Sequence, residues 1–253
     1  MRKAHSTMMI FVIFVHSALA RRRGGVHSDR MKRSKINALI RDSEAWVDSM
    51  GFALPPWAHW PPERWATVGD AAAEIRDNML GWDVTDFGRG RYEEFGLLLF
   101  TIRNGNPARD RKPYAEKIMV VSERQGNPMH FHWNKMEDII NRGGGRFSVE
   151  LYGSTPEGEF SDAPVRFRVD GIEREVPPGG KAVLDVGESI CIEQGVYHRF
   201  FAEGGRVLAG EVSMVNDDRT DNRFHEPLGR YAEIEEDEAP YRLLCGDYGR
   251  FLA

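Results

Sequence analysis

Three histidines and one glutamate carry the strongest chemical signal in this chain of 253 residues. His130 and His132 are two residues apart, so on a strand both imidazoles would point to one face. Glu137 follows soon after, and His198 belongs to a separate, Gly-spaced segment. Three imidazoles and a carboxylate suit a divalent transition metal such as Mn, Fe, Co, Ni or Zn. Four protein ligands leave open positions on an octahedral ion, which predicts a metal enzyme.

A His-x-His pair alone is also common on exposed strands that bind no metal. The second segment, which runs from Gly187 to His198, is what favours a metal site. Together the two segments resemble the paired motifs of the cupin superfamily. Glu193 and Ala202 stand where the second motif usually has Pro and Asn, but no ligand position is lost. The matching positions are His130, His132, Glu137, Gly143 and Gly144 in the first motif, and Gly187, Gly195 and His198 in the second.

The segment from His130 to Gly145 is more specific, because it resembles the signature of the D-lyxose isomerases, which are cupins. The resemblance runs from Met31 to the C-terminus and includes residues 211–218, 234–238 and 241–245. It implies a metal-dependent aldose–ketose isomerase that interconverts D-lyxose with D-xylulose and D-mannose with D-fructose. It also implies a preference for Mn²⁺ (with Co²⁺, Fe²⁺, Ni²⁺ or Zn²⁺ as alternatives) and a homodimer.

Isomerisation through an enediol needs a group that moves a proton between C1 and C2 of the sugar. Lys135 lies between two ligand positions, where it could donate a proton or act as a fixed cation. Glu211 is the first choice for the base and Glu235, in an acidic run, is the second. Each has an ordinary alternative: Lys135 could pair with Asp138, Glu211 could only orient a ligand histidine, and Glu235 could be solvated.

Asn216, Asp218 and Arg242 offer donors and acceptors that suit sugar hydroxyls, although they could equally stabilise a turn. This polar set favours a polyol over the apolar substrate expected of a cupin metal dioxygenase, which is the nearest alternative. A phosphosugar isomerase would need clustered cations at a phosphate site, and the sequence shows no clear cluster. A non-catalytic sugar-binding cupin is the alternative from another class of protein.

Composition limits the partners. The net charge of −5 argues against a nucleic-acid binder, and two cysteines fit a reducing compartment. Residues 1–30 are expected to be an upstream extension, with the working chain starting at Met31. Residues 1–20 can also be drawn as a secretory signal, but the three arginines from Arg21 favour retention in the cytoplasm. We therefore predict a cytoplasmic enzyme whose mature domain has no membrane partner.

The elements around these residues indicate a mostly β fold: a cupin double-stranded β-helix barrel with N-terminal α-helices packed outside. Residues 31–90 are expected to form the helical region, with helices from Met31 to Met50 and from Pro62 toward Met79. Residues 91–253 are expected to form the barrel and a C-terminal tail. Their alternating pattern predicts strands at 95–103, 117–123, 146–152, 165–169, 181–186, 188–193, 197–202 and 207–215.

Two groups of glycines predict turns. Asp170-Gly171 is a two-residue hairpin signal between neighbouring strands. The run from Gly143 to Gly145 is expected to form a positive-φ turn that brings Glu137 back toward the mouth of the barrel.

Overall fold

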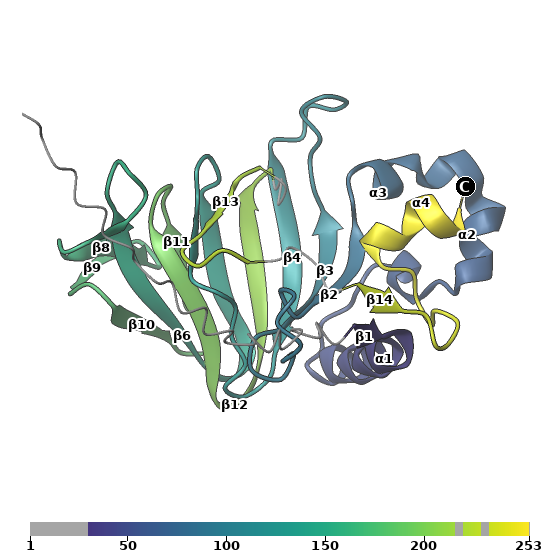
Figure 1. Ribbon diagram of the computed structural model, residues 1–253, viewed down its shortest axis with the longest axis horizontal. Coiled ribbons are helices and arrows are strands. Elements are labelled where there is room, and N and C mark those ends of the chain that lie inside the picture. Colours follow the sequence, from purple (N-terminus) through teal and green to yellow (C-terminus); the bar gives the residue numbers. More distant parts are fainter. Residues whose placement is uncertain (1–29, 216–219, 229–232, 253) are drawn as a thin grey trace, which may run out of the picture.

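The computed structural model describes residues 30–215, 220–228 and 233–252. It confirms a mostly β molecule with helices packed outside the sheet (Figure 1). The first predicted helix is present as α1, but the second is divided at Gly69, whose φ is +58°. The helices are α1 (Arg33–Ser49), α2 (Pro62–Val68), α3 (Ala73–Asp77) and α4 (Tyr248–Phe251), with 3₁₀ turns at Pro56–His59, Gly69–Ala72 and Cys245–Asp247.

The main sheet is antiparallel and strongly curved. Its hydrogen-bonded path is β2 (Gly81–Thr85), β3 (Leu97–Arg103), β4 (Tyr114–Val121), β12 (Tyr197–Met214), β6 (Glu137–Ser154), β11 (Ser189–Ile192), β8 (Val165–Val169) and β9 (Ile172–Val176). β7 (Phe160–Ser161) and β10 (Gly180–Leu184) also pair with β6. β5 (His130–His132) lies between β12 and β13 (Asn222–Phe224).

This topology corrects three details of the prediction. The path ends at β2 and β9, so the sheet does not close its edges as a complete barrel. The strands expected at 197–202 and 207–215 are one long strand, β12, with a register shift between them. The sheet also begins earlier than expected, because β2 lies inside the range predicted as helical. The Asp170-Gly171 hairpin is present between β8 and β9.

The expected glycine turn after Glu137 is wrong. Gly143 and Gly144 lie inside β6, which continues through them, at the point where the register with β12 shifts. Both have positive φ, and a Cβ on Gly144 would lie 2.0 Å from the carbonyl oxygen of Arg206. The glycines therefore allow an irregular strand to approach its neighbour closely. Glu137 needs no turn here, because it already begins β6 beside the histidine strand.

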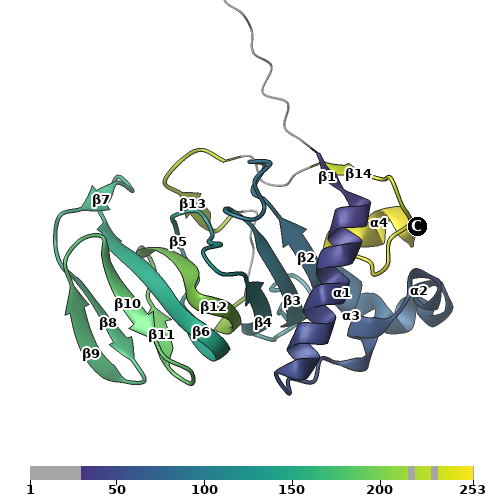
Figure 2. The same ribbon diagram turned by 90° about the horizontal axis from the view of Figure 1, so that it is seen from below.

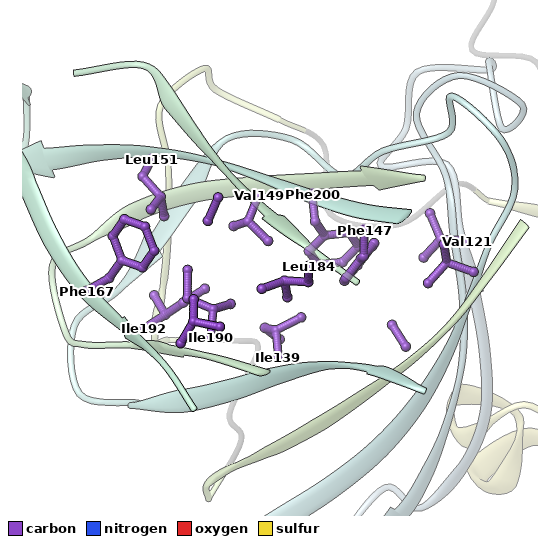
Figure 3. Close-up of a cluster of buried hydrophobic side chains, with 14 of the residues drawn as sticks. Val121, Ile139, Phe147, Val149, Leu151, Phe167, Leu184, Ile190, Ile192 and Phe200 are labelled. Atoms are coloured by element: carbon purple, nitrogen blue, oxygen red, sulfur yellow. The ribbon is translucent and has the colours of Figure 1, made fainter. Parts of the chain in front are cut away.

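The sheet separates two apolar cores. The inner core fills the space between the curved layers and draws on β4, β6, β8, β10, β11 and β12, with Phe147, Val149, Leu151 and Leu184 fully buried (Figure 3). The outer core lies between α1 and the strands β2, β3 and β4. Side chains of β3 alternate between the two cores: Leu97 and Leu99 pack on the inner core, whereas Leu98 and Phe100 pack on the outer one.

Helix α1 is held by the outer core. Ile36, Ile40 and Val47 recur on one helical face and are at most 1% exposed. Burying each of these side chains stabilises the fold by about 1.5–3 kcal/mol. In Figure 2 α1 lies along β2 and β3, on the side of the molecule away from β8 and β9.

Segments near the two ends of the described chain lie side by side next to α1. β1 (Met31–Lys32) pairs in parallel with β14 (Ile234–Glu235), and α4 lies next to them (Figures 1 and 2). The predicted C-terminal tail thus returns to the helical side of the molecule. Within the three described ranges no helix is both long and apolar enough to cross a membrane.

Candidate active site

The three histidines meet at one end of the curved sheet. His130 and His132 lie on β5, and His130 is in register with His198 on β12. The imidazole centroid of His130 is 5.0 Å from that of His132 and 4.3 Å from that of His198. One ring nitrogen from each residue can be chosen so that all three lie within 4.8 Å of one another. The expectation that β5 turns both of its imidazoles to one face is confirmed.

Backbone contacts fix two of the rings. The Nδ1 of His130 lies 2.9 Å from the carbonyl oxygen of Pro128, and the Nδ1 of His198 lies 3.0 Å from that of Val196. Each carbonyl accepts a hydrogen bond, so each ring carries its proton on Nδ1 and keeps Nε2 as an acceptor. Among the described residues, the buried Nε2 atoms of His132 and His198 have no hydrogen-bond partner. Unpaired ring nitrogens that converge in this way fit a bound cation.

Glu137 faces the same point with one of its two oxygens. Its Oε1 lies 3.0 Å from Nε2 of His198 and 3.6 Å from Nε2 of His132. Its Oε2 instead pairs with the Nζ of Lys135 at 2.6 Å. The carboxylate can therefore offer one oxygen beside the imidazoles and keep its ion pair with Lys135 on the other.

A second carboxylate, Glu211, lies on the other side of Lys135. The Lys135 Nζ donates to Glu211 Oε1 at 3.0 Å, and the Lys117 Nζ lies 3.2 Å from the same oxygen. Ser213 also donates its hydroxyl to that oxygen at 3.0 Å. The four charged side chains are at most 5% exposed, and two lysines balance two glutamates. Lys135 thus pairs with Glu137 and Glu211 rather than with Asp138.

Burial and charge set the protonation states in this cluster. Burial, together with the neighbouring imidazoles, holds the pKa of His130 well below its ordinary value of 6.5. Burial would raise the pKa of Glu137, but Lys135 and His132 outweigh it and hold that pKa well below 4.5. Burial opposes ionisation of Glu211 too, and Lys117 and Lys135 still lower its pKa. At neutral pH the cluster holds neutral His130 and two ionised carboxylates.

The structure does not bring every predicted site residue to this cluster. Glu235 is exposed on β14, beside β1 on the helical side of the molecule. Arg242 is on the same side, where its guanidinium donates to Glu44 at 2.8 Å and to the Tyr241 hydroxyl at 2.8 Å. Neither residue therefore lies at the histidine cluster, and their predicted roles stay predictions. Asn216 and Asp218 lie outside the described residues.

The histidines of β5, Lys135 and the two glutamates line a cavity, and this cavity also contains polar residues that the sequence did not single out. Lys117 lies on the same face of β4 as Met119 and Val121, and only its pairing with β12 places it against Glu211. Asn127 is buried, and its side-chain oxygen accepts a hydrogen bond from the backbone N–H of Phe200 at 2.7 Å. The alternation of side chains along each strand could have identified the polar positions that face inward. It could not have shown which of these side chains contact one another across strands. The additional polar lining residues are Asp83, Thr85, Lys117, Asn127 and Asn222.

Comparison with known proteins agrees with this geometry. Residues 31–248 match the family model described as D-lyxose isomerase. The chain is 45% identical over 228 residues to the D-lyxose/D-mannose isomerase of Serratia proteamaculans, covering 88% of this chain and 100% of the relative. It is 46% identical over 226 residues to the D-lyxose/D-mannose isomerase of Escherichia coli O157:H7, covering 87% of this chain and 100% of the relative.

Solved structures show that the fold is shared more widely. The L-ribose isomerase of Cellulomonas parahominis, in a structure with L-psicose, superposes with a TM-score of 0.54 at 15% identity, over 81% of this chain and 99% of that one. The L-ribose isomerase of Geodermatophilus obscurus gives a TM-score of 0.54 at 13% identity, over the same shares. The predicted cupin fold and the prediction of a sugar isomerase are confirmed, and the chain belongs to the D-lyxose isomerase family.

Proposed function

We propose that this protein is a metal-dependent aldose–ketose isomerase that interconverts D-lyxose with D-xylulose and D-mannose with D-fructose. One observation carries the proposal: a cavity lined by His130, His132 and Glu211 adjoins three converging imidazoles, and the buried Glu211 is held between two lysines. The first feature suits a divalent cation, and the second suits proton transfer. The relatives from Serratia proteamaculans and Escherichia coli supply the choice of sugars.

The residues present fit a divalent ion. His130, His132 and His198 would hold it through Nε2, and Glu137 would hold it through Oε1. The buried, unpaired Nε2 atoms of His132 and His198 support this set of ligands. A divalent ion bound here would supply Lewis acidity that polarises a sugar carbonyl. Mn²⁺ is our first choice on the family resemblance, and the nitrogen and oxygen donors are equally compatible with Co²⁺, Fe²⁺, Ni²⁺ or Zn²⁺.

Glu211 is the base that we assign to the proton transfer between C1 and C2. It is ionised at neutral pH because Lys117 and Lys135 lower its pKa against the effect of burial. When Glu211 takes a proton, the cluster gains one positive charge. Negative charge that develops on the sugar oxygens balances that gain, so the same two lysines stabilise both states.

Lys135 is the group that we assign to the sugar oxygen. Its Nζ is within 3.0 Å of carboxylate oxygens of both Glu137 and Glu211, and Lys135 lines the cavity that would hold the sugar. As an ammonium it is a hydrogen-bond donor without an acceptor site, which suits a developing alkoxide. Phe87 and Phe224 form part of the cavity wall and would help to exclude water.

The direct test is a screen of free sugars with Mn²⁺, before and after chelation. We expect D-xylulose from D-lyxose and D-fructose from D-mannose, measured by chromatography. The activity should be lost on chelation and restored by added metal. If metal-loaded protein turns over no free aldose or ketose, the proposed function is wrong.

A second test addresses the ligand set. His198→Ala should remove bound Mn²⁺, measured as metal per chain after gel filtration. His59→Ala is the matched control, because His59 is half-exposed, contacts Glu44 through Nδ1 at 3.2 Å and lies on the helical side. Unchanged metal content in His198→Ala would remove that residue from the set.

Three further proposals rest on the sequence alone. We propose a homodimer, which light scattering would test, and a cytoplasmic location, which cell fractionation would test. Asn216 and Asp218 remain proposed contacts to sugar hydroxyls, and alanine variants of them should raise KM.

A further inference from the structure

Asp221 is a buried carboxylate that takes part in none of the chemistry above. It is 6% exposed and lies just before β13. Its Oδ1 accepts hydrogen bonds from the backbone N–H of Asn134 at 2.8 Å and from the Asn134 side chain at 2.9 Å. Its Oδ2 accepts from the backbone N–H of Lys135 at 2.9 Å. One side chain therefore ties down the turn between the ligand strand β5 and Glu137.

The same carboxylate faces the one imidazole of the three that is not fixed by a carbonyl. Nδ1 of His132 has no hydrogen-bond partner among the described residues, whereas His130 and His198 each use Nδ1 against a backbone carbonyl. Asp221 Oδ2 lies 4.0 Å from this Nδ1. A carboxylate oxygen has two lone pairs, so Oδ2 can accept from His132 while it keeps the bond from Lys135.

We propose that Asp221 is a positioning residue that orients both His132 and Lys135. At 4.0 Å, Nδ1 of His132 lies beyond hydrogen-bond distance of Asp221 Oδ2. When a metal binds Nε2, a shift of the ring by about 1 Å would let Oδ2 accept the Nδ1 proton. Oδ2 also holds the backbone of Lys135, so that Nζ reaches Glu137 and Glu211. A carboxylate behind a ligand histidine fixes the tautomer and the ring orientation and makes the other nitrogen a stronger donor to metal. This inference rests on the metal site that we proposed above.

Asp221→Asn is the appropriate variant, because it keeps the shape and removes one acceptor. An amide side chain has one oxygen, so its NH₂ group must face either the turn or Nδ1 of His132, and both of these are donors. We expect the Kd for Mn²⁺ to rise about 10–100-fold. We also expect kcat to stay reduced at saturating Mn²⁺, because Lys135 is misplaced as well.

Asp110→Asn is the matched control. Asp110 also accepts two backbone N–H groups, those of Asn106 and Lys112, and one side-chain amide, that of Asn78. It ties a loop in the same way but contacts none of the three histidines. The control should lose thermal stability to a similar degree while its Kd for Mn²⁺ and its kcat stay within about twofold of the starting protein.

Mn²⁺ titration, activity at saturating Mn²⁺ and thermal melting of the metal-free protein distinguish the outcomes. If the starting protein binds no Mn²⁺, the metal site fails and this inference fails with it. If the starting protein binds Mn²⁺ and Asp221→Asn binds it equally well, only the role at His132 is wrong. Full recovery of kcat at saturating Mn²⁺ would overturn the role at Lys135.

A measurement on the unchanged protein avoids dependence on the folding of a variant. With ¹⁵N-labelled histidine and diamagnetic Zn²⁺, three ring N–H signals protected from exchange should appear on metal addition, one for each ligand imidazole. The appearance of only two would show that Nδ1 of His132 has no acceptor, and would contradict the proposal.

Discussion

Arg33 and Lys135 are both buried cations held between two carboxylates, yet their surroundings indicate different roles. Arg33 is fully buried and forms paired hydrogen bonds with Glu236 at 2.8 and 2.9 Å and with Asp247 at 2.8 and 2.9 Å. Its planar guanidinium matches both carboxylates. Lys135 is 4% exposed and reaches Glu137 and Glu211 with one Nζ.

The difference lies in what surrounds each cation. The Arg33 cluster joins α1 to the C-terminal segment, and two carboxylates take up four of its N–H groups. The Lys135 cluster lines a cavity and adjoins imidazole nitrogens that have no hydrogen-bond partner in the described part of the chain. Buried charge alone therefore does not identify a functional site; buried charge next to unpaired acceptors and open space does.

Glu211→Gln gives the largest effect that this comparison predicts. Loss of the base should lower kcat about 10²–10⁴-fold, with Mn²⁺ content unchanged. Glu150→Gln is the control, since Glu150 pairs with Arg199 on the outer face of β6. The measurement is kcat on D-lyxose per metal-loaded chain. Activity within tenfold of the starting protein would exclude Glu211 as the base.

Arg33→Met tests whether the Arg33 cluster stabilises the fold. It removes the cation that pairs with the buried Asp247, whereas Glu236 keeps its ion pair with Arg250, so we expect the free energy of unfolding in urea to fall by about 3–5 kcal/mol. Arg250→Met is the control, because Arg250 pairs with the same Glu236 but is 62% exposed, and we expect about 1 kcal/mol or less. The folded fraction should keep its kcat. A selective loss of kcat would mean that the two clusters are coupled.

Lys135→Ala tests whether the lysine of the cavity acts in the reaction. We expect kcat to fall about 10²-fold while Mn²⁺ stays bound, because an ammonium is not a metal ligand. Metal content and kcat are measured on the same sample. If the variant loses its metal, Lys135 supports Glu137 rather than the sugar.

The local parts of the site could be predicted from the sequence. His130 and His132 share a face because side chains alternate along a strand, and β5 obeys that rule. The meeting of Lys117 with Glu211 could not be predicted, since it depends on the register of β4 against β12, which are far apart in the chain. Pairing between distant strands is set by the whole core, not by the residues of either strand.

Two expectations differ from the placement that the structure shows, each for a physical reason. A run of glycines permits positive φ in a tight turn or in an irregular strand, and here Gly144 serves the strand because Arg206 approaches it. The acidic run indicated a base at Glu235, but in that segment it is Glu236 that turns inward to Arg33. Composition identified the run, and only the packing shows which member pairs with Arg33.

Acid should lower the stability of the histidine site and of the Arg33 cluster in different pH ranges, with smaller effects than the substitutions above. Burial lowers the pKa of both His130 and His132 below 6.5, so these rings bind protons in the unfolded chain before they do so in the folded one. Their contribution to stability is therefore complete above pH 6.5 and is lost as pH falls toward the folded-state pKa values. In the Arg33 cluster, the hydrogen bond from Arg33 lowers the pKa of Glu236 below 4.5, so its contribution is lost only below that pH.

For metal-free protein we expect the free energy of unfolding to fall between pH 7 and pH 5, by at most about 1.4 kcal/mol per pH unit for each histidine. Urea titrations at stepped pH should give the same fall for Arg33→Met, whereas His130→Gln should reduce it. If Arg33→Met instead removes this fall in the free energy of unfolding, the acid response above pH 5 belongs to the Arg33 cluster and not to the histidines.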